Sequence, residues 1–181
     1  MKTRIALFIG ALCAMPAQAD APLEFNMSGQ AVFTRIKAAD ENFSPKLFQL
    51  KAGVELTDSA LAGVGLQAMV GLPIADSTKN NFTIDIDAQH GAYLTLTDPT
   101  AAPDAVKFVL YVGYATTKLE VSPDFTGGSA NRTFDGTSYG FSLQQRIYAN
   151  KPWAWSLDCT RFYRDSNMRI DGCGVGANYE F

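Results

Sequence analysis

Apolar and polar residues alternate along most of this chain. In residues 23–38, for example, Phe25 and Met27 fall on one face of an extended strand, and Glu24 and Asn26 fall on the other. Successive side chains of a strand point to opposite faces, so a period of two predicts a strand, whereas a period near 3.6 would predict a helix. Eight segments show this pattern: residues 23–38, 46–57, 60–72, 81–97, 105–117, 137–148, 153–164 and 169–181.

The length of these segments indicates a membrane protein. Each is about 11 to 17 residues long, whereas strands of soluble sheets average roughly 5 or 6 residues. A tilted strand needs about 9 to 11 residues to cross a bilayer. The apolar face of such a strand points to lipid and the polar face to the lumen. We therefore predict an all-β fold over residues 20–181: an eight-stranded, antiparallel, up-and-down transmembrane β-barrel.

The polar faces carry charges of both signs. A barrel of about eight strands has room inside only for side chains, and buried charges usually have partners. We therefore expect ion pairs that fill the lumen, which disfavours a narrow channel. Paired carboxylates could also bind a cation or act as acid and base, but we favour pairing of Asp85 and Asp87 with a lumen cation. The predicted lumen charges are Lys51, Glu55, Asp85, Asp87, Lys107, Arg146 and Asp158, with Glu24 and Glu180 on the same faces.

The connections fit an N-terminus in the periplasm, with short inner turns and longer outer loops. The longest connection, residues 118–136, falls on the outside. It contains no phosphate-binding or nucleophile motif, and as a surface loop it is the best candidate for contact with an extracellular partner. The outer loops are predicted at residues 39–45, 73–80, 118–136 and 165–168, and the inner turns at residues 58–59, 98–104 and 149–152.

The first nineteen residues have the features of a secretory signal peptide. Lys2 and Arg4 precede a short apolar run, and residues 17–19 (Ala-Gln-Ala) form a small-residue cleavage site. We expect cleavage after Ala19, which makes Asp20 the first mature residue. A lipoprotein anchored through Cys13 is the alternative; it is disfavoured because Leu12 stands where a small residue is expected.

Removal of the signal peptide makes the chain more acidic. The full chain has 15 Lys and Arg against 18 Asp and Glu. Because the signal peptide contains Lys2, Arg4 and no acid, the mature chain has 13 against 18, a net charge of −5. This charge argues against a nucleic-acid partner, which would require a basic face.

Two cysteines, Cys159 and Cys173, remain after cleavage. The periplasm is oxidising and permits a disulfide. If the last hairpin turns near residues 166–167, the two cysteines face each other, and a cross-strand disulfide is predicted within the limits on Cα separation. The alternative is two small apolar residues that face lipid.

Aromatic residues gather near the predicted strand ends, as in the girdles at the two membrane interfaces. A sugar-binding platform is the alternative interpretation. The single histidine, His90, falls on the lipid-facing register, where an interfacial role is the default. A catalytic role would need a nucleophile or a carboxylate in reach, and no paired ligand spacing indicates a metal site. The aromatic set is Tyr139, Tyr148, Trp153, Trp155, Tyr163, Tyr179 and Phe181.

Two segments, Phe134–Phe141 and Gly172–Phe181, resemble the sixth and last strands of OmpA-like small outer-membrane barrels. The resemblance implies location in the outer membrane, contact with its lipid and lipopolysaccharide, and recognition of Tyr179 and Phe181 by the barrel-assembly machinery. It implies no cofactor. A resemblance to the outer-membrane lipid A deacylase would require a serine two residues after the histidine, and that position is Ala92.

Such barrels serve as anchors, adhesins, defence proteins and enzymes, so the fold alone does not give the activity. Our leading hypothesis is a non-enzymatic barrel with a structural or surface-interaction role. The alternatives are an enzyme that modifies lipid A or phospholipid, a narrow channel, and a soluble periplasmic ligand-binding barrel with its apolar faces inside.

Overall fold

The computed structural model describes residues 23–38, 41–58, 60–100, 102, 105–123, 128–148 and 151–181. The expected signal peptide and its cleavage site lie outside these residues. Within them, no helix is long and apolar enough to cross a membrane. The described residues form strands and turns: β1 (Leu23–Ala38), β2 (Glu41–Phe43), β3 (Lys46–Leu56), β4 (Val64–Ala75), β5 (Ser77–Lys79), β6 (Phe82–Thr97), β7 (Lys107–Pro123), β8 (Ala130–Arg146), β9 (Trp153–Arg164) and β10 (Met168–Glu180).

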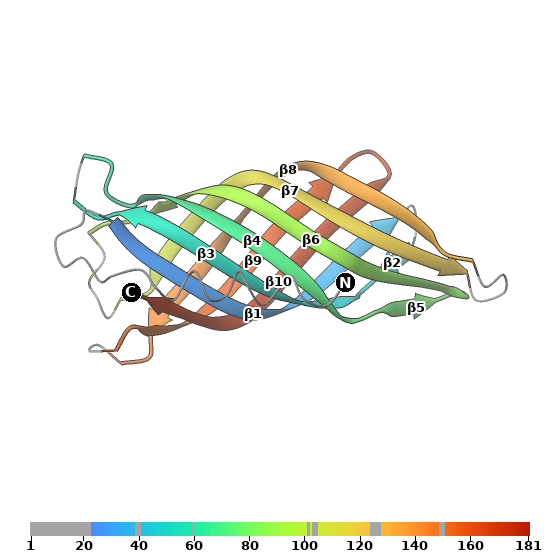
Figure 1. Cartoon of the computed structure of the whole chain (residues 1–181), viewed down its shortest axis with the longest axis horizontal. Helices are drawn as coiled ribbons and strands as arrows, with labels where there is room; N and C mark the ends of the chain where they lie inside the picture. Colours follow the sequence, from blue (N-terminus) through green and yellow to red (C-terminus); the bar gives the residue numbers. More distant parts are fainter. Residues whose placement is uncertain are drawn as a thin grey trace, which may run out of the picture.

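Eight long strands close into an antiparallel barrel (Figure 1). The sheet order is β10-β9-β8-β7-β6-β4-β3-β1, and β1 pairs with β10 to complete the ring. This closing ladder extends from Asn26 opposite Glu180 to Ala38 opposite Met168. Closure matters because a backbone group that faces lipid must find its hydrogen-bond partner within the protein. The predicted eight-stranded, up-and-down barrel is confirmed.

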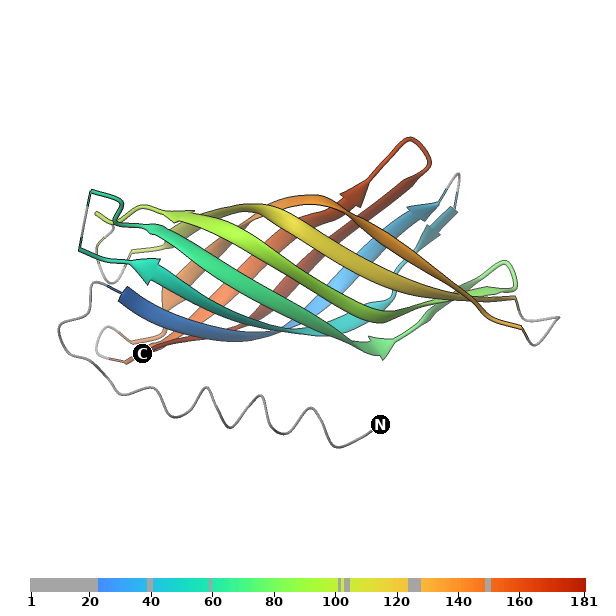
Figure 2. The same ribbon diagram turned by 45° about the horizontal axis from the view of Figure 1, so that its top comes forward.

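The two ends of the barrel differ. At one end, which we call the terminal end, lie Phe181 and the connections from β3 to β4, from β6 to β7 and from β8 to β9. At the other, which we call the far end, β2 pairs with the end of β1 and β5 pairs with the start of β6 (Figure 2). Our predicted orientation puts the terminal end in the periplasm, since short turns face that side in such barrels.

Turns that contain residues with positive φ angles join neighbouring strands at both ends of the barrel. Asn80 and Asn81, between β5 and β6, both have positive φ angles, 49° and 64°, as the two central residues of a type I′ hairpin require. Gly63 has a φ of 84°, and a Cβ atom there would lie 2.2 Å from the carbonyl oxygen of Thr97. The residues before Val64 therefore form a turn rather than the predicted start of the third strand at Ala60.

The far-end strands are longer than predicted. β7 continues to Pro123 and β8 begins at Ala130, with pairs such as Lys118 opposite Thr133. The predicted loop 118–136 is therefore mostly paired strand, and residues 124–127 lie outside the described residues. Likewise, β2, β5 and the end of β4 occupy much of the predicted loops 39–45 and 73–80. The alternation fades there because strands beyond the lipid need no continuous apolar outer face.

The outward faces carry the apolar surface of the molecule. Many large apolar side chains are exposed, among them Leu94 at 50% and Leu110 at 46%. On the same strands, Tyr93 and Tyr111 point inward and are 3% and 5% exposed. This pattern fits strands that face lipid on the outside.

Candidate functional site

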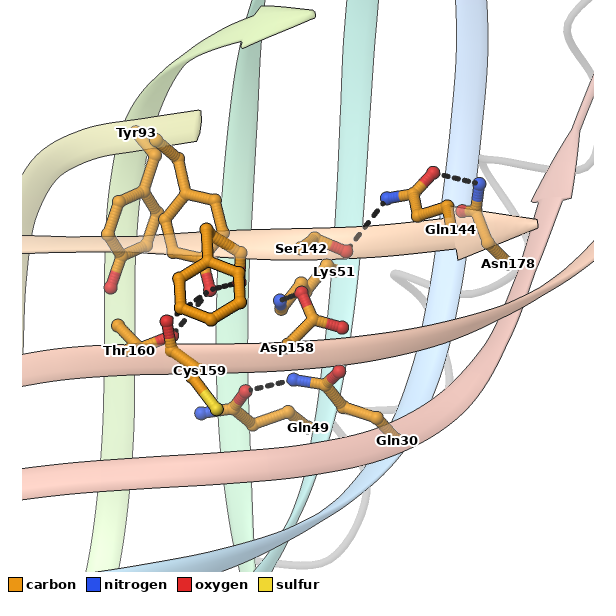
Figure 3. A network of polar contacts seen from close by, with 12 residues as sticks. Gln30, Gln49, Lys51, Tyr93, Ser142, Gln144, Asp158, Cys159, Thr160 and Asn178 are labelled. Atoms are coloured by element: carbon orange, nitrogen blue, oxygen red, sulfur yellow. Dashed lines mark hydrogen bonds and ion pairs between the residues drawn. The ribbon is translucent and has the colours of Figure 1, made fainter. Parts of the chain in front are cut away.

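The middle of the lumen contains a buried ion pair that joins opposite walls of the barrel (Figure 3). Lys51 Nζ from β3 lies 2.7 Å from Asp158 Oδ1 of β9, and the two side chains are only 4% and 6% exposed. The Lys51 ammonium also lies 5.2 Å from the centre of the Tyr111 ring, within cation–π range. Two of the predicted lumen charges are thus brought together across the barrel.

A chain of amides and hydroxyls continues from this ion pair. Gln30 Nε2 donates to Gln49 Oε1 at 2.7 Å; with the amide group turned over, Gln30 donates instead to Asp158 Oδ2 at 2.6 Å. Gln49 Nε2 donates to Gln89 Oε1 at 2.6 Å, and Gln89 Nε2 donates to Thr117 Oγ1 at 3.1 Å. The middle layer is therefore occupied by mutually bonded polar groups, as buried polar groups require.

Two buried tyrosines extend this layer and link β6, β7, β8 and β9. The Tyr111 hydroxyl lies 2.6 Å from Thr160 Oγ1, and the Tyr93 hydroxyl lies 3.0 Å from Ser138 Oγ. The two tyrosine rings meet edge to face, with centroids 5.4 Å apart. No role was predicted for these tyrosines from the sequence. Each alternates with apolar residues that face outward, and this alternation could have placed both rings in the lumen.

The terminal end of the lumen is charged and partly open. Lys107 Nζ lies 3.3 Å from Glu55 Oε2 and 4.0 Å from Glu180 Oε1. Arg146 Nη2 lies 2.5 Å from Glu180 Oε2. These residues and Glu24 line a cavity of about 210 Å³. Three predicted lumen charges, Glu55, Lys107 and Arg146, therefore form one network at this end. Glu180, which was predicted on the same faces, completes it.

The far half of the lumen is apolar, which the sequence analysis did not anticipate. Ile36, Leu47, Ile86 and Leu119 are fully buried there. The signal was present in β1, where Ile36 points inward between the exposed Arg35 and Lys37. The buried apolar cluster consists of Val32, Ile36, Phe43, Leu47, Met69, Ile84, Ile86, Tyr93, Tyr111, Ala115, Leu119, Phe162 and Ile170.

The placement of Asp85 and Asp87 in the lumen is wrong. Ile84 and Ile86 point inward, with exposures of 4% and 0%, so Asp85 lies on the opposite, outward face. Asp87 lies at a bulge between Ile86 and Ala88, and its Oδ2 is 2.5 Å from Lys118 Nζ on the exposed surface. A bulge inserts one unpaired residue and exchanges the two faces of the strand before it. Periodicity alone cannot reveal that exchange.

The last hairpin is joined by a disulfide between Cys159 and Cys173. The two residues are directly opposite in the β9–β10 ladder, and their Cα atoms are 4.1 Å apart. Cys159 also faces Phe141 on β8. The cross-link therefore lies on the outward face of the barrel wall.

Aromatic side chains gather on the outward surface of the terminal end. The Tyr179 ring meets Trp153 and Phe181 edge to face, with centroids 4.9 and 4.8 Å apart. The Phe181 amide donates to the carbonyl oxygen of Phe25 at 2.9 Å, which ties the last residue to β1. Tyr148, Trp153, Trp155 and Phe181 are exposed at this end. Tyr139 is also exposed, but it lies further along β8, where its hydroxyl accepts from Arg161 Nη1 at 3.1 Å.

Tyr163 departs from the predicted girdle. It is partly buried against the apolar cluster, with its ring 5.4 Å from that of Phe134. The cause is a second register shift, beside Phe162 in the β9–β10 ladder. Tyr163 follows this shift and therefore points inward.

His90 lies exposed on the outward face of β6. Its cross-strand neighbours are Val70 on β4 and Thr116 on β7, and Ala92 is the next residue on the same face. Neither a serine nor a carboxylate is opposite it in these two ladders. Among the described residues, no group of three or more His, Cys, Asp or Glu could hold a metal ion.

Comparison with known families decides the class of the protein. The profile of the outer membrane protein beta-barrel domain family matches residues 5–181. The chain belongs to this family. It is therefore an outer-membrane β-barrel protein, with the surface properties described above. No curated protein matches the sequence.

Several solved outer-membrane barrels are similar to this chain in fold. The attachment invasion locus protein Ail of Yersinia pestis, in complex with the heparin analogue sucrose octasulfate, is 19% identical with a TM-score of 0.58, covering 89% of this chain and all of that one (100%). Neisserial surface protein A is 12% identical with a TM-score of 0.64, at 87% and 97% coverage. The N-terminal barrel of OprF from Pseudomonas aeruginosa is 12% identical with a TM-score of 0.56, at 86% and 97% coverage. At these identities the likeness concerns the fold.

Proposed function

We propose that this protein is a non-enzymatic outer-membrane barrel that acts through its outer surface, in envelope structure or surface interaction, and not through its interior. The observation that carries the proposal is the buried Lys51–Asp158 pair, which joins β3 to β9 across the middle of the lumen. The amide chain of Gln49 and Gln89 lies beside it. Toward the far end, buried side chains such as Leu47 and Phe162 occupy the remaining space.

The channel alternative is tested by planar-bilayer recording of the purified protein. We expect no stable conductance steps from the wild type, because the lumen is occupied by its own side chains. The variant Asp158→Ala, with Leu94→Ala on the outward face as the matched control, shows whether the ion pair is part of the barrier. Regular steps from the wild type would contradict the proposal.

The enzyme alternative is tested by mass spectra of lipid A and phospholipids from cells with and without the gene. His90 has Val70 and Thr116 opposite it. No carboxylate is opposite it in these ladders to orient the ring, as a nucleophile–base set requires. We therefore expect identical spectra. An acyl chain lost or gained only when the gene is present would show catalysis, and His90→Ala would then identify whether the histidine takes part.

The route to the membrane is part of the same proposal. A signal peptide is removed after Ala19, and the assembly machinery recognises Tyr179 and Phe181; the mature barrel then contacts outer-membrane lipid and lipopolysaccharide. Phe181→Ala should reduce the fraction that reaches the compact, heat-modifiable form, whereas Phe108→Ala, which also removes an exposed ring, should not. Amino-terminal sequencing should begin at Asp20. Equal assembly of both variants would remove the role given to Phe181.

A further inference from the structure

Outward charges at the far end of the barrel are divided by sign. On the strands around the β10–β1 seam, six cations face outward with one acid, Asp171; we call this the basic side. On the strands around the β6–β7 seam, five acids face outward with one cation, Lys118; we call this the acidic side. The basic side consists of Arg35, Lys37, Lys46, Arg161, Arg164 and Arg169, and the acidic side of Asp76, Asp85, Asp87, Glu120 and Asp135.

The basic side has more cations than its own carboxylate can neutralise. Asp171 forms ion pairs with both Arg161 and Arg169, whose Nε atoms lie 2.8 and 2.7 Å from its two carboxylate oxygens. Arg35 Nε donates to the neutral amide oxygen of Asn42 at 3.3 Å. Although Arg35 stands opposite Asp171 in the β1–β10 ladder, it forms no ion pair with a carboxylate within the described residues. Lys46 lies over the Phe33 ring. Neither Lys46 nor the exposed Lys37 has a carboxylate within 4 Å among the residues that the structure describes.

The acidic side has the opposite excess. Lys118 neutralises Asp87, while Asp85 lies opposite Glu120 in the β6–β7 ladder. Like charges directly opposite each other destabilise a sheet. Asp85 Oδ1 is buried without a hydrogen-bond partner in the described part of the chain. Asp76, just before β5, adds a further exposed carboxylate.

The two sides lie opposite each other on the barrel. Around the ring, the β10–β1 seam is separated from the β6–β7 seam by β9 and β8 in one direction, and by β3 and β4 in the other. Both sides are on the outward surface of the same end. The acidic side of one molecule can therefore meet the basic side of a neighbour that stands upright in the same membrane.

We propose that copies of this chain associate side by side in the outer membrane, with the acidic side of one against the basic side of the next. The occupant of each side is thus a second copy, chosen by charge complementarity. A two-fold dimer would instead place like charges together. A head-to-tail contact between opposite faces does not close on itself, so it produces open rows. Exposed ion pairs are weak and screened by salt, so the rows are reversible.

Cross-linking in isolated outer membranes tests this contact. A carbodiimide joins an amine to a carboxylate only when the two groups touch. We expect a ladder of dimers, trimers and higher species at low salt, which weakens as salt is raised. Peptide mass spectra should identify links from Lys37 or Lys46 of one copy to Asp85 or Glu120 of another.

Charge-reversal variants distinguish these rows from a two-fold dimer and from binding of lipid phosphates to the basic side. Lys37→Glu with Lys46→Glu should lower the cross-linked fraction about tenfold, the effect of losing a small free energy of contact. Asp85→Lys with Glu120→Lys should do the same, and a chain with all four changes should regain the ladder. Lys151→Glu, an exposed cation at the terminal end, is the matched control. Heat-modifiability shows that each variant has folded.

Three results would overturn the proposal. The first is a wild type that stays monomeric while Lys37→Glu with Lys46→Glu reduces bound lipopolysaccharide, which would assign the basic side to lipid phosphates. The second is a ladder that stops at the dimer. The third is a ladder that survives reversal of one side in a folded variant.

Discussion

In the terminal half of the barrel, apolar side chains face outward and charged ones line the lumen, whereas in the far half the arrangement is reversed. Strand β1 contains both patterns. Near its start, Phe25 is exposed and Glu24 points inward; near its end, Arg35 is exposed and Ile36 is fully buried. One continuous strand thus belongs to two environments.

The reversal follows from what surrounds each half. Lipid favours apolar outward faces, so the charges of the terminal half lie inside and neutralise one another, as Glu55 and Lys107 do. Strands beyond the lipid meet water on the outside, and there the interior gains stability by burying apolar surface, as in a soluble barrel. In β6 and β9 the register shifts at Asp87 and Phe162 help to change the faces.

The largest effect is expected where a charge loses its partner in the middle layer. Asp158→Ala leaves the Lys51 ammonium buried and unpaired, and breaking a buried pair in this way costs about 3–5 kcal/mol. Urea unfolding in lipid vesicles measures the loss. The double variant Lys51→Met with Asp158→Leu should stay close to the wild type. An equal loss in both variants would show that packing, rather than the ion pair, holds this layer.

A cavity in the far half should cost nearly as much. Leu47→Ala removes a side chain that is 0% exposed, and such truncations cost about 2–5 kcal/mol. Leu94→Ala, which removes the same atoms from a side chain exposed on the outward face, should cost less in the same unfolding experiment. If the two losses were equal, the far half would not have the packed interior described above.

The disulfide on the barrel wall should contribute a similar or smaller amount. Cys159 and Cys173 are 14 residues apart in the sequence, and a cross-link closing a loop of about 15 residues stabilises by roughly 3 kcal/mol. Reductant should therefore lower the unfolding midpoint of the wild type. The variant with both cysteines changed to serine should not respond to reductant. A wild-type midpoint that does not move would mean that the bond adds no stability.

A charge at the open terminal end should matter less than the buried pair. The Arg146 side chain is 33% exposed, so solvent screens its contact with Glu180, and exposed pairs contribute about 1 kcal/mol or less. Arg146→Gln should therefore shift unfolding slightly, and added salt should reduce the shift further. A loss as large as that of Asp158→Ala would remove the distinction between the middle and terminal layers.

The smallest effect concerns the far-end turn of the last hairpin. Hydrogen bonds from the Asn167 amide, the Tyr163 hydroxyl and the Met168 amide lower the pKa of Asp165. Since an unfolded Asp titrates near about 3.9, this stabilisation is present above that pH and is lost as the pH falls through the lower folded pKa. Protection of the Asn167 and Met168 amides, taken relative to the intrinsic exchange rate at each pH, should fall below about pH 4, and Asp165→Ala should lack this protection at every pH.

Much of the barrel could be predicted from local sequence, because side-chain alternation and strand length are properties of neighbouring residues. The eight strands, the faces of most of them and the opposition of Cys159 and Cys173 depend on the period of two and on one short turn. Lys51, Glu55, Lys107, Arg146 and Asp158 were assigned to the lumen for the same reason.

Other features are decided only when the barrel closes. The partner of Lys51 is 107 residues away in the sequence, so the ring of strands, and not local pattern, selects Asp158. The outward position of Asp87 depends on a bulge that the neighbouring residues in the sequence do not predict. The length of β7 and β8 depends on a ladder between two polar segments. In short, the sequence by itself determined which residues form strands and which face each takes within an unbroken register. The tertiary structure alone decided where that register shifts and which distant charges meet, because both depend on contacts across the closed barrel.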